Sequence, residues 1–199
     1  MDFHRIKKVV TTEHTLRDDE WKGAVLFLCD ERDVYFIKRS DKMPTHGGQV
    51  AFVGGHKTAA DRDPWDAARR EFEEETSISR EVLEFVGYLP VVLTARLQPI
   101  IPVVAKLTVS KEEFLGSVVS NGEWVDLMAY PWSELAQEQN WEFAWRNGYG
   151  RSPVLFHTLK NGKFEALTAD HHAHLLWGAT ASMVWDFLHL YFKPSVGSY

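Results

Sequence analysis

The sequence contains very little cysteine. Cys29 is the single cysteine among 199 residues, and it lies within an apolar run. One cysteine excludes an internal disulfide, and this usage fits the reducing cytosol. Residues 1–5 lack the apolar stretch of a signal peptide, and no apolar run reaches the roughly 18 residues that a membrane span needs. We therefore expect a cytoplasmic protein that does not enter the membrane.

Positive charge is scarce as well. Lysine and arginine total 22, against 28 aspartates and glutamates, which gives a formal net charge of −6. An acidic chain without a basic stripe does not attract nucleic acid or an anionic membrane over long range. This balance disfavours an enzyme that acts on RNA ends. A protein of this kind that binds a polyanion needs metal ions and a local basic patch.

Apolar sequence is plentiful. Hydrophobic residues make up 45% and charged residues 25%, as in ordinary globular proteins, and the length suffices for one well-buried domain. We expect a single domain over residues 1–199, in which residues 1–22 are an N-terminal extension with a packing or homodimer role. Apolar, β-branched runs predict strands over residues 23–29, 34–38, 49–53, 83–94, 99–109 and 124–129.

The remaining segments carry helix and turn signals. Short helices are predicted over residues 12–21 and 131–139, and an amphipathic closing helix over residues 177–191. Residues 116–122 are predicted as a loop, and Asn161-Gly162 is a typical hairpin turn. Strands that alternate with an interior and a terminal helix predict an α/β fold, with helices flanking a mixed sheet.

The helix with the strongest signals starts at Asp63-Pro64. The Asp63 side chain can cap the first turn, and proline suits the first helical position. Trp65, Ala68 and Phe72 recur at helical spacing, which predicts an apolar face that packs on a sheet.

Three carboxylates share another face of this helix. Glu71, Glu74 and Glu75 fall within one turn, where like charges repel one another. Hard divalent cations prefer oxygen ligands, and Mg²⁺ typically takes one or two carboxylates together with substrate phosphates. A solvated acidic face is the alternative. Arg70, directly before the first glutamate, and a glycine pair upstream favour the metal site.

The segment Arg70–Ile78 resembles the Nudix box, whose core is Arg-Glu-apolar-any-Glu-Glu-any-Gly-apolar after a glycine-led loop. This chain departs from the box at Ser77, where the family has glycine. Its loop is one residue longer than the common box and lacks the usual loop glutamate, with Asp61 or Arg62 nearest that place. The resemblance implies a Nudix-type α/β/α sandwich with a mixed sheet and the acidic Nudix helix.

Two segments upstream are similar to the coenzyme A pyrophosphatase branch of this family. Its signature runs roughly Lys-Arg-Ser, then Leu-Arg-any-His-any-Gly-Gln-Val-Ala-Phe-Pro-Gly-Gly, and this chain has matching residues over 38–40 and 46–55. Met43-Pro44 replaces the Leu-Arg pair, and Val53 replaces the proline. Residues 177–181 are similar to the closing helix of the branch.

The resemblance implies roles for individual residues. A carbonyl of the glycine pair would bind Mg²⁺ or Mn²⁺ together with the carboxylates, so the metal candidates are Gly54, Gly55, Glu71, Glu74 and Glu75. The catalytic candidates are Glu71, Glu74, Arg70 and Glu123. The sequence leaves open which carboxylate accepts the proton, and an exposed loop glutamate is the alternative for position 123.

The substrate candidates implied by the branch signature are Lys38, Arg39, His46 and Gln49. Lysine and arginine side chains suit phosphate contact, with a solvated loop as the alternative for the first two positions. We expect His46 to have a structural or substrate-contacting role rather than that of a general base. Structural zinc is disfavoured at His171, His172 and His174. Asp170 is the only carboxylate at ligand spacing from them, and no cysteine lies at that spacing.

The branch implies hydrolysis of the diphosphate of coenzyme A or its derivatives, with 3′,5′-ADP and 4′-phosphopantetheine as products. The alternative is another nucleoside diphosphate derivative, namely ADP-ribose, a nucleotide sugar or NADH. A non-catalytic nucleotide-binding Nudix module is a third hypothesis, which the intact carboxylates disfavour. The expected partner is a small molecule, without nucleic acid or membrane.

Overall fold

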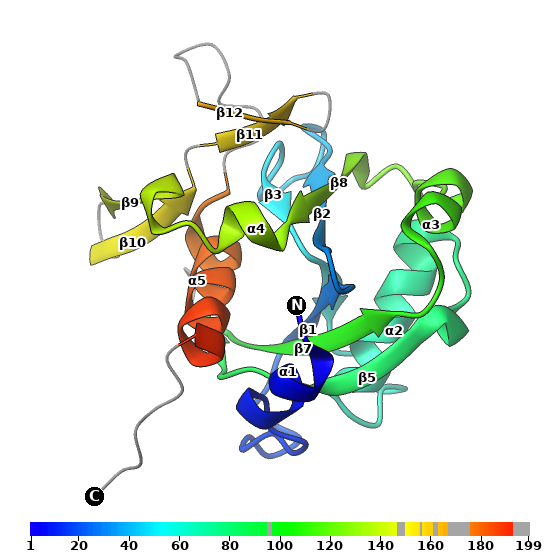
Figure 1. The fold of residues 1–199 in the computed structure, drawn as a ribbon. Coiled ribbons are helices and arrows are strands. Elements are labelled where there is room, and N and C mark those ends of the chain that lie inside the picture. The colour runs from blue at the N-terminus through cyan, green and yellow to red at the C-terminus, as the bar shows by residue number, and fades with distance from the viewer. Residues whose placement is uncertain (95–96, 147–149, 156, 161–162, 167–175, 193–199) are drawn as a thin grey trace, which may run out of the picture.

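The computed structural model describes residues 1–94, 97–146, 150–155, 157–160, 163–166 and 176–192. A mixed sheet crosses the molecule, with helices on both of its faces (Figure 1). The strands of this sheet are β1 (Gly23–Cys29), β2 (Asp33–Arg39), β3 (Val50–Ala51), β4 (Val53–His56), β5 (Leu83–Tyr88), β6 (Val92–Leu93), β7 (Pro99–Leu107) and β8 (Trp124–Pro131). The helices are α1 (Phe3–Val9), α2 (Pro64–Thr76), α3 (Lys111–Ser117), α4 (Trp132–Leu135) and α5 (Gly178–Phe192), with 3₁₀ turns η1 (Arg80–Val82) and η2 (Glu138–Asn140).

The sheet is built around β1 and β7. These strands pair in parallel over seven residue pairs, and the order of the main path is β3-β2-β1-β7-β5. Strands β4, β6 and β8 pair with β1, β7 and β2, all three antiparallel. A strand buried on both faces reads as a continuous apolar run, which explains why the sequence of β1 is apolar throughout.

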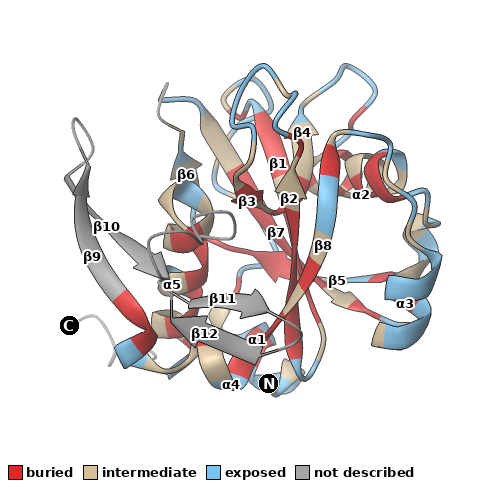
Figure 2. Cartoon of the chain, turned by 90° about the horizontal axis from the view of Figure 1, so that it is seen from above, coloured by how far each residue is buried: buried red, intermediate tan, exposed pale blue. Residues whose placement is uncertain are grey.

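Side chains that alternate along β1 enter two different cores. Leu26 and Leu28 join the cluster beneath α2, whereas Phe27 and Cys29 join the cluster beneath α5. This period of two is the geometry of a strand. Figure 2 shows the buried strands between the helices. The central sheet therefore separates the molecule into two apolar layers.

The helix α2 buries its predicted apolar face. Ala68 and Phe72 are fully buried against β1 and β7, with Trp65 packed at the margin. The Phe72 ring stacks with that of Phe114 from α3, with ring centroids 6.0 Å apart. Full burial of a phenylalanine contributes about 2–3 kcal/mol, so these contacts fix the position of α2 on the sheet.

The other layer is formed by α5 and α1. The ring of Phe187 lies 5.0 Å from that of Phe27, and Ile6 of α1 joins the same cluster. The predicted closing helix is confirmed, since Ala181, Val184, Leu188 and Tyr191 are all buried. In Figure 1, α5 and α2 lie on opposite sides of the sheet.

The prediction of a helix over residues 12–21 is wrong. The first helix is instead α1, where the Asp2 side chain accepts a hydrogen bond from the backbone N–H of His4 at 2.8 Å. Residues 12–21 form turns, in which Arg17 and Glu20 bond each other through backbone and side chains. The N-terminal extension thus packs through α1.

Four other predicted segments differ from the structure. The strand expected over residues 49–53 is divided at Phe52 into β3 and β4, and the strand expected over residues 83–94 is divided into β5 and β6. A helix, α3, reaches into the expected loop over residues 116–122, with the Ser110 side chain capping its first turn. The helix expected over residues 131–139 is shortened to α4 and η2.

Two hairpins follow η2. Strands β9 (Trp141–Arg146) and β10 (Gly150–Leu155) pair antiparallel, as do β11 (His157–Lys160) and β12 (Lys163–Ala166). The second pair confirms the hairpin that was predicted from its turn sequence, although the turn residues 161–162 lie outside the described residues. The histidine cluster of residues 171–174 also lies outside the described residues. None of the described helices has the length and apolarity that a membrane crossing requires.

Candidate active site

The site is positioned by the junction of β4 and α2. Asp63 caps α2 by accepting a hydrogen bond from the backbone N–H of Asp66 at 2.8 Å, and Pro64 follows at the first helical position. This local chemistry fixes where the helix begins, and its apolar face fixes the rotation about its axis. Together they decide which glutamates face the sheet.

Gly54 and Gly55 lie on β4, which pairs with the start of β1. Gly54 has φ +148°, and a Cβ there would collide with the backbone of β1. A Cβ at Gly55 would collide with the carboxylate of Glu71. Glycine is therefore required at both positions. Gly54 allows β4 to approach β1, and Gly55 allows the Glu71 carboxylate to approach β4.

Glu75 lies deepest in the site. It is only 2% exposed, and its Oε1 accepts a hydrogen bond from the backbone N–H of Gly54 at 3.3 Å. Its Oε2 is buried without a hydrogen-bond partner among the described residues. Burial raises the pKa of this carboxyl to about 8, and repulsion from Glu123 and Glu71 adds to the effect. A buried carboxylate with an open oxygen calls for a positive partner.

Arg70 connects the helix to the preceding loop. Its Nε and Nη2 donate to the two carboxylate oxygens of Asp61 at 2.9 and 3.0 Å. Its Nη1 donates to Glu71 at 2.9 Å and to Glu74 at 3.1 Å, and its Nη2 also donates to the carbonyl of His56 at 3.1 Å. Arg70 thus joins two of the three helical glutamates to the loop that precedes the helix.

Asp61 is the residue whose role the sequence did not reveal. Its side chain is almost fully buried, and the Arg70 guanidinium and Thr58 hydrogen bonds hold its pKa low, against the opposing effect of burial. It lies where the usual loop glutamate of the Nudix box is missing. That absence was the available signal, since a carboxylate nearby must then serve the arginine.

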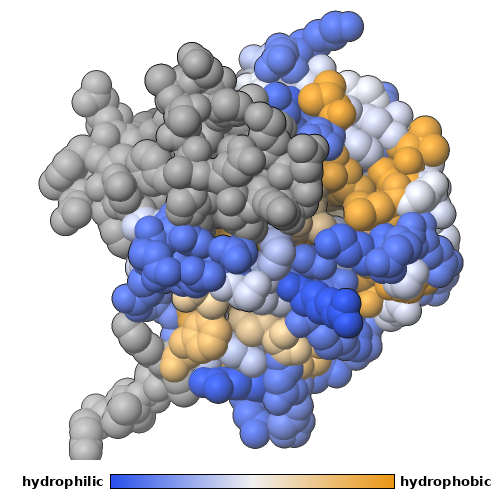
Figure 3. Space-filling model, turned by 45° about the horizontal axis from the view of Figure 1, so that its top comes forward, coloured by the Kyte–Doolittle hydropathy of each residue, from blue (hydrophilic) through white to orange (hydrophobic). Residues whose placement is uncertain are grey.

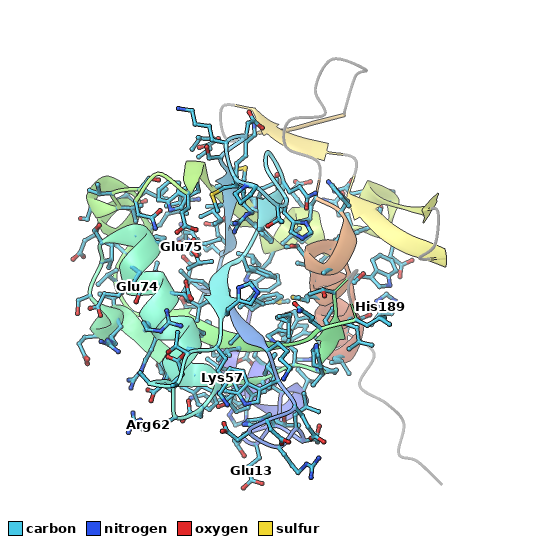
Figure 4. The ribbon with its side chains drawn as sticks, turned by 180° about the vertical axis from the view of Figure 1, so that it is seen from behind. Glu13, Lys57, Arg62, Glu74, Glu75 and His189 are labelled. Carbon is cyan, nitrogen blue, oxygen red and sulfur yellow. The ribbon has the colours of Figure 1, made fainter. Side chains whose placement is uncertain are left out.

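The three helical carboxylates do not share one environment. Burial raises the pKa of Glu71, and the neighbouring Arg70 opposes this shift. Glu74 is bonded to the same guanidinium, but its side chain is 57% exposed. Figure 4 shows Glu74 and Glu75 at different positions on α2. Within the part of the chain that the structure describes, no three His, Cys, Asp or Glu side chains form a complete metal site.

The oxygen donors nevertheless fit a hard divalent cation. Glu71 and Glu75 both lie against the glycine pair of β4, and one oxygen of Glu75 has no partner. Mg²⁺ is usually bound by one or two protein carboxylates, with water and substrate phosphates completing its shell. The residues that would hold such an ion are therefore these two glutamates, with Glu74 at the exposed margin.

Glu123 and Arg39 reach the same place from elsewhere in the chain. The negative charge of Glu123 raises the pKa of both Glu71 and Glu75, whereas Arg39 lowers that of Glu75. The backbone N–H of Ser40 donates to the carbonyl of Glu123 at 2.7 Å, which joins the end of β2 to the start of β8. Sequence spacing alone could not bring these segments together.

Comparison with known proteins identifies the family. A family model described as the NUDIX domain matches residues 20–146, which is more than half of the chain. The chain belongs to the NUDIX family. Proteins of this family hydrolyse phosphorus-containing anhydrides and generally need divalent metal ions.

Several relatives resemble this NUDIX protein. The mitochondrial Nudix hydrolase 15 of Arabidopsis thaliana is 28% identical over 169 residues, covering 82% of this chain and 56% of its own. The uncharacterized Nudix hydrolase NudL of Enterobacter sp. (strain 638) is 43% identical over 86 residues, covering 42% of this chain and 45% of its own. This NUDIX chain thus spans about half the length of the curated relatives it matches.

Solved structures with the same family name are also similar. A MutT/nudix family protein from Enterococcus faecalis has a TM-score of 0.47 and 16% identity, with 88% of this chain and 62% of that chain covered. A NUDIX hydrolase from Nitrosomonas europaea has a TM-score of 0.46 and 18% identity, with 61% and 63% covered.

The departure from the NUDIX box at Ser77 has a clear backbone consequence. Ser77 ends α2 in the left-handed conformation, with φ 58° and ψ 18°, and its N–H donates to the carbonyl of Glu73. Left-handed backbone is where the family's glycine is free of strain. The serine is tolerated there at a cost in stability.

The substrate candidates lie at the end of β2 and in the loop after it. The backbone N–H of Arg39 donates to the carbonyl of Gln49 at 2.9 Å, and Nδ1 of His46 lies 3.2 Å from the Gln49 side-chain oxygen. His46 is exposed, while Lys38 is half-buried. The Nε of Arg39 is buried without a hydrogen-bond partner among the described residues, so this side chain retains a donor for a ligand.

Exposed apolar residues are dispersed. On the face shown in Figure 3, hydrophobic side chains gather in separate patches with hydrophilic residues between them. The large exposed hydrophobic residues among those described are Leu93, Leu97, Leu115, Val119, Val125 and Phe192. They come from different elements, and this dispersal does not define a docking surface.

Proposed function

We propose that this protein is a metal-dependent pyrophosphohydrolase of a nucleoside diphosphate derivative, with coenzyme A or its derivatives as the preferred substrate. The observation that carries the proposal is the buried carboxylate of Glu75 beside Glu71 and the glycine pair. Family membership supports the reaction class. The branch signature of residues 38–40 and 46–55 supports the substrate.

The protein's own residues would divide the work. Arg70 holds Glu71 and Glu74 in one orientation through ion pairs of 2.9 and 3.1 Å. Glu71 and Glu75 would hold Mg²⁺ or Mn²⁺, and such an ion, when bound, polarises phosphoryl oxygens and lowers the pKa of bound water. A carboxylate of this group, with Glu123 as a further candidate, would accept the proton of the attacking water.

The substrate would be held by residues at the end of β2 and in the loop after it. Arg39 offers a planar fork to a phosphate, and Lys38 offers a compact charge beside it. His46 and Gln49 are joined side chain to side chain at 3.2 Å, which orients both for contact with the remainder of the substrate. Hydrolysis of coenzyme A at the diphosphate would release 3′,5′-ADP and 4′-phosphopantetheine.

A substrate panel tests this proposal. Coenzyme A, ADP-ribose, a nucleotide sugar and NADH are each incubated with Mg²⁺ or Mn²⁺, and products are identified by phosphorus NMR. We expect the highest kcat/KM for coenzyme A. Dephospho-coenzyme A should be the poorer substrate because the arginine fork then lacks its phosphate partner. Arg39→Ala removes the fork and should narrow the gap in kcat/KM between the two substrates.

The panel also separates the alternatives. A far higher kcat/KM for ADP-ribose, a nucleotide sugar or NADH would overturn the choice of coenzyme A and leave the reaction class standing. Pro44 and Val53, which depart from the branch signature, keep that alternative in view. Tight binding without turnover of any substrate would instead indicate a nucleotide-binding module.

The localisation, domain organisation and assembly of the protein are part of the same proposal. We infer a cytoplasmic enzyme whose single domain spans residues 1–199 and whose partner is a small molecule, with a homodimer as the proposed assembly. Light scattering coupled to size exclusion tests the homodimer, which a monomer mass at working concentration would exclude.

A further inference from the structure

A cavity of about 280 Å³ lies along α2, beside the loop that precedes the helix. Its charged lining consists of Asp61, Arg62, Asp66, Arg69, Arg70 and Arg80, and we call it the arginine cavity. One water needs only about 15 Å³, so the space admits a larger group. Four guanidinium groups around one cavity in a protein of net charge −6 require an explanation.

One of the four is fully engaged. Each guanidinium carries five N–H donors, and those of Arg70 are directed to Asp61, Glu71, Glu74 and the carbonyl of His56. Arg70 therefore belongs to the active site and only closes one side of the cavity.

The other three keep free donors. Arg62 and Arg69 share the single carboxylate of Asp66, which accepts from the Nη2 of Arg62 at 2.9 Å and also from Arg69. Arg80 pairs with Glu73 at 3.0 Å on the surface, and such an exposed pair can open at small cost. The Nε of Arg69 is buried with no hydrogen-bond partner in the described chain. The Arg69 guanidinium also lies over the Trp65 ring, 5.8 Å from its centroid, so Arg69 keeps donors that no described group accepts.

The helix α2 strengthens this argument. Arg62 directly precedes the capping residue Asp63, so its positive charge lies at the positive end of the helix dipole. Asp66 in the first turn is shared by the two arginines, and Asp63 is a further carboxylate that acts on Arg62. An anion between Arg62, Arg69 and Arg80 would balance both the side chains and the helix end.

We propose that the arginine cavity binds a phosphate group. The planar forks of arginine match phosphate oxygens, and free donors come from three elements: the loop before α2, α2 itself and η1. Figure 4 shows Arg62, which precedes α2, well apart from Glu75 on the last turn of that helix, so this phosphate does not occupy the carboxylate site. Its source is either free phosphate in solution or an outlying phosphate of the bound substrate.

Calorimetric titration of inorganic phosphate into metal-free protein tests binding directly. The variant combines Arg62→Gln with Arg80→Gln, which leaves the active-site arginine intact. Arg17→Gln is the matched control, because the Arg17 and Arg62 side chains are both 76% exposed and both are paired with carboxylates. EDTA and constant ionic strength exclude binding through a metal or through general screening.

We expect saturable binding in the wild type, at least tenfold weaker affinity in the double variant, and no change in the control. Equal affinity in the wild type and the double variant would overturn the proposal, as would the absence of saturable binding. Thermal unfolding without phosphate verifies that the double variant folds.

Kinetics with the best substrate identify the source of the phosphate, and this second arm rests on the proposed function. A raised KM with unchanged kcat in the double variant assigns the cavity to a phosphate of the substrate. Unchanged KM, with phosphate affinity lost, assigns it to free phosphate. Should no substrate be hydrolysed, the proposed function fails while the titration still decides the cavity.

Discussion

Glu75 is held where water cannot solvate its charge. Burial and the neighbouring glutamates oppose the ionised form, while the backbone N–H of Gly54 and the positive charge of Arg39 favour it. The protein thus maintains an unfavourable group at the centre of the site. Such groups persist where function needs them, and a cation that binds there also relieves the repulsion.

Glu75→Gln should lower kcat by at least two orders of magnitude at saturating Mg²⁺, because a metal ligand is lost. The same change should leave the thermal midpoint of the metal-free protein unchanged or raise it, since an amide replaces a buried carboxyl whose ionised form is unfavourable there. Paired activity and thermal unfolding measurements test both parts. Glu13→Gln, on an exposed loop, is the control (Figure 4). Near-wild-type turnover in the Glu75 variant would refute the assignment.

Ser77→Gly should stabilise the protein by about 1 kcal/mol, because glycine adopts the left-handed conformation at φ 58° without strain. Denaturant unfolding measures the gain. Ser79→Gly provides the contrast, since Ser79 has φ −56° and caps η1 through its side chain. That variant should lose stability. A loss at position 77 would show that the serine has a compensating contact.

At the scale of elements, the loop before α2 and the helix itself act as one unit. The bidentate pair of Arg70 and Asp61 joins them, and both side chains are largely buried. Arg70→Ala should lower the free energy of unfolding by about 3 kcal/mol, since it leaves the buried carboxylate of Asp61 without its positively charged partner. It should also lower kcat by tenfold or more.

Asp61→Asn separates the two effects, because it weakens the junction and leaves the arginine on the glutamates. Chemical unfolding and steady-state kinetics of both variants, beside Arg17→Ala as an exposed control, provide the comparison. If Arg70→Ala were fully active but less stable, the role of Arg70 would be structural alone.

The start of α2 also gives a pH dependence. Hydrogen bonds from Arg62, together with those from Arg69, lower the pKa of Asp66 to about 2, below its usual value of 3.8. A depressed carboxyl pKa contributes stability above the unfolded value, and that contribution is lost as the pH falls from about 4 towards 2. It amounts to at most about 2 kcal/mol, since Arg62 is exposed and screened.

Asp66→Asn should therefore be less stable than the wild type at pH 5–7, with the difference narrowing below about pH 4. Unfolding free energies across this range measure the effect. Asp19→Asn, an exposed aspartate, should show no comparable change. A difference that stays constant down to pH 3 would contradict the assigned cause.

The elements that the sequence predicts well are those with local signals. The cap at Asp63, the proline after it and the apolar stripe to Phe72 specify α2 without reference to the rest of the chain. By contrast, α1 is short, and its stability comes from the burial of Ile6 beneath α5, which is far away in sequence.

The site follows the same division. Glu71, Glu74 and Glu75 are found from helical spacing alone, and the box resemblance places Arg70 with them. The buttressing by Asp61 and the approach of Glu123 depend on tertiary structure. So does the difference in burial between Glu74 and Glu75, since neighbouring positions on a helix differ only once its packing face is fixed.

At the scale of the whole molecule, the central sheet joins two apolar layers that carry different tasks. The layer beneath α2 supports the carboxylates, and the layer beneath α5 closes the far face. Phe187 is fully buried, and its ring centroid lies 5.0 Å from that of Phe27 and 5.3 Å from that of Trp132.

Phe187→Ala should destabilise the protein by about 3–5 kcal/mol, the cost of a large cavity in a packed core. Phe192→Ala, on the same helix but 48% exposed, should cost far less. Unfolding midpoints in denaturant compare the two. Equal losses would mean that α5 is not docked as the structure shows.

The parallel pairing of β1 with β7 has a consequence during synthesis. Gly23 pairs with Ile100 and Cys29 pairs with Lys106. The ribosome must therefore add about 77 residues after β1 has been synthesised before its partner β7 is complete. At about 5–20 residues per second, that delay is roughly 4–15 s on the ribosome. Strands β2 and β4 emerge earlier and can cover one edge of β1. Its other edge, apolar and open for pairing, stays exposed to neighbouring nascent chains until β7 emerges.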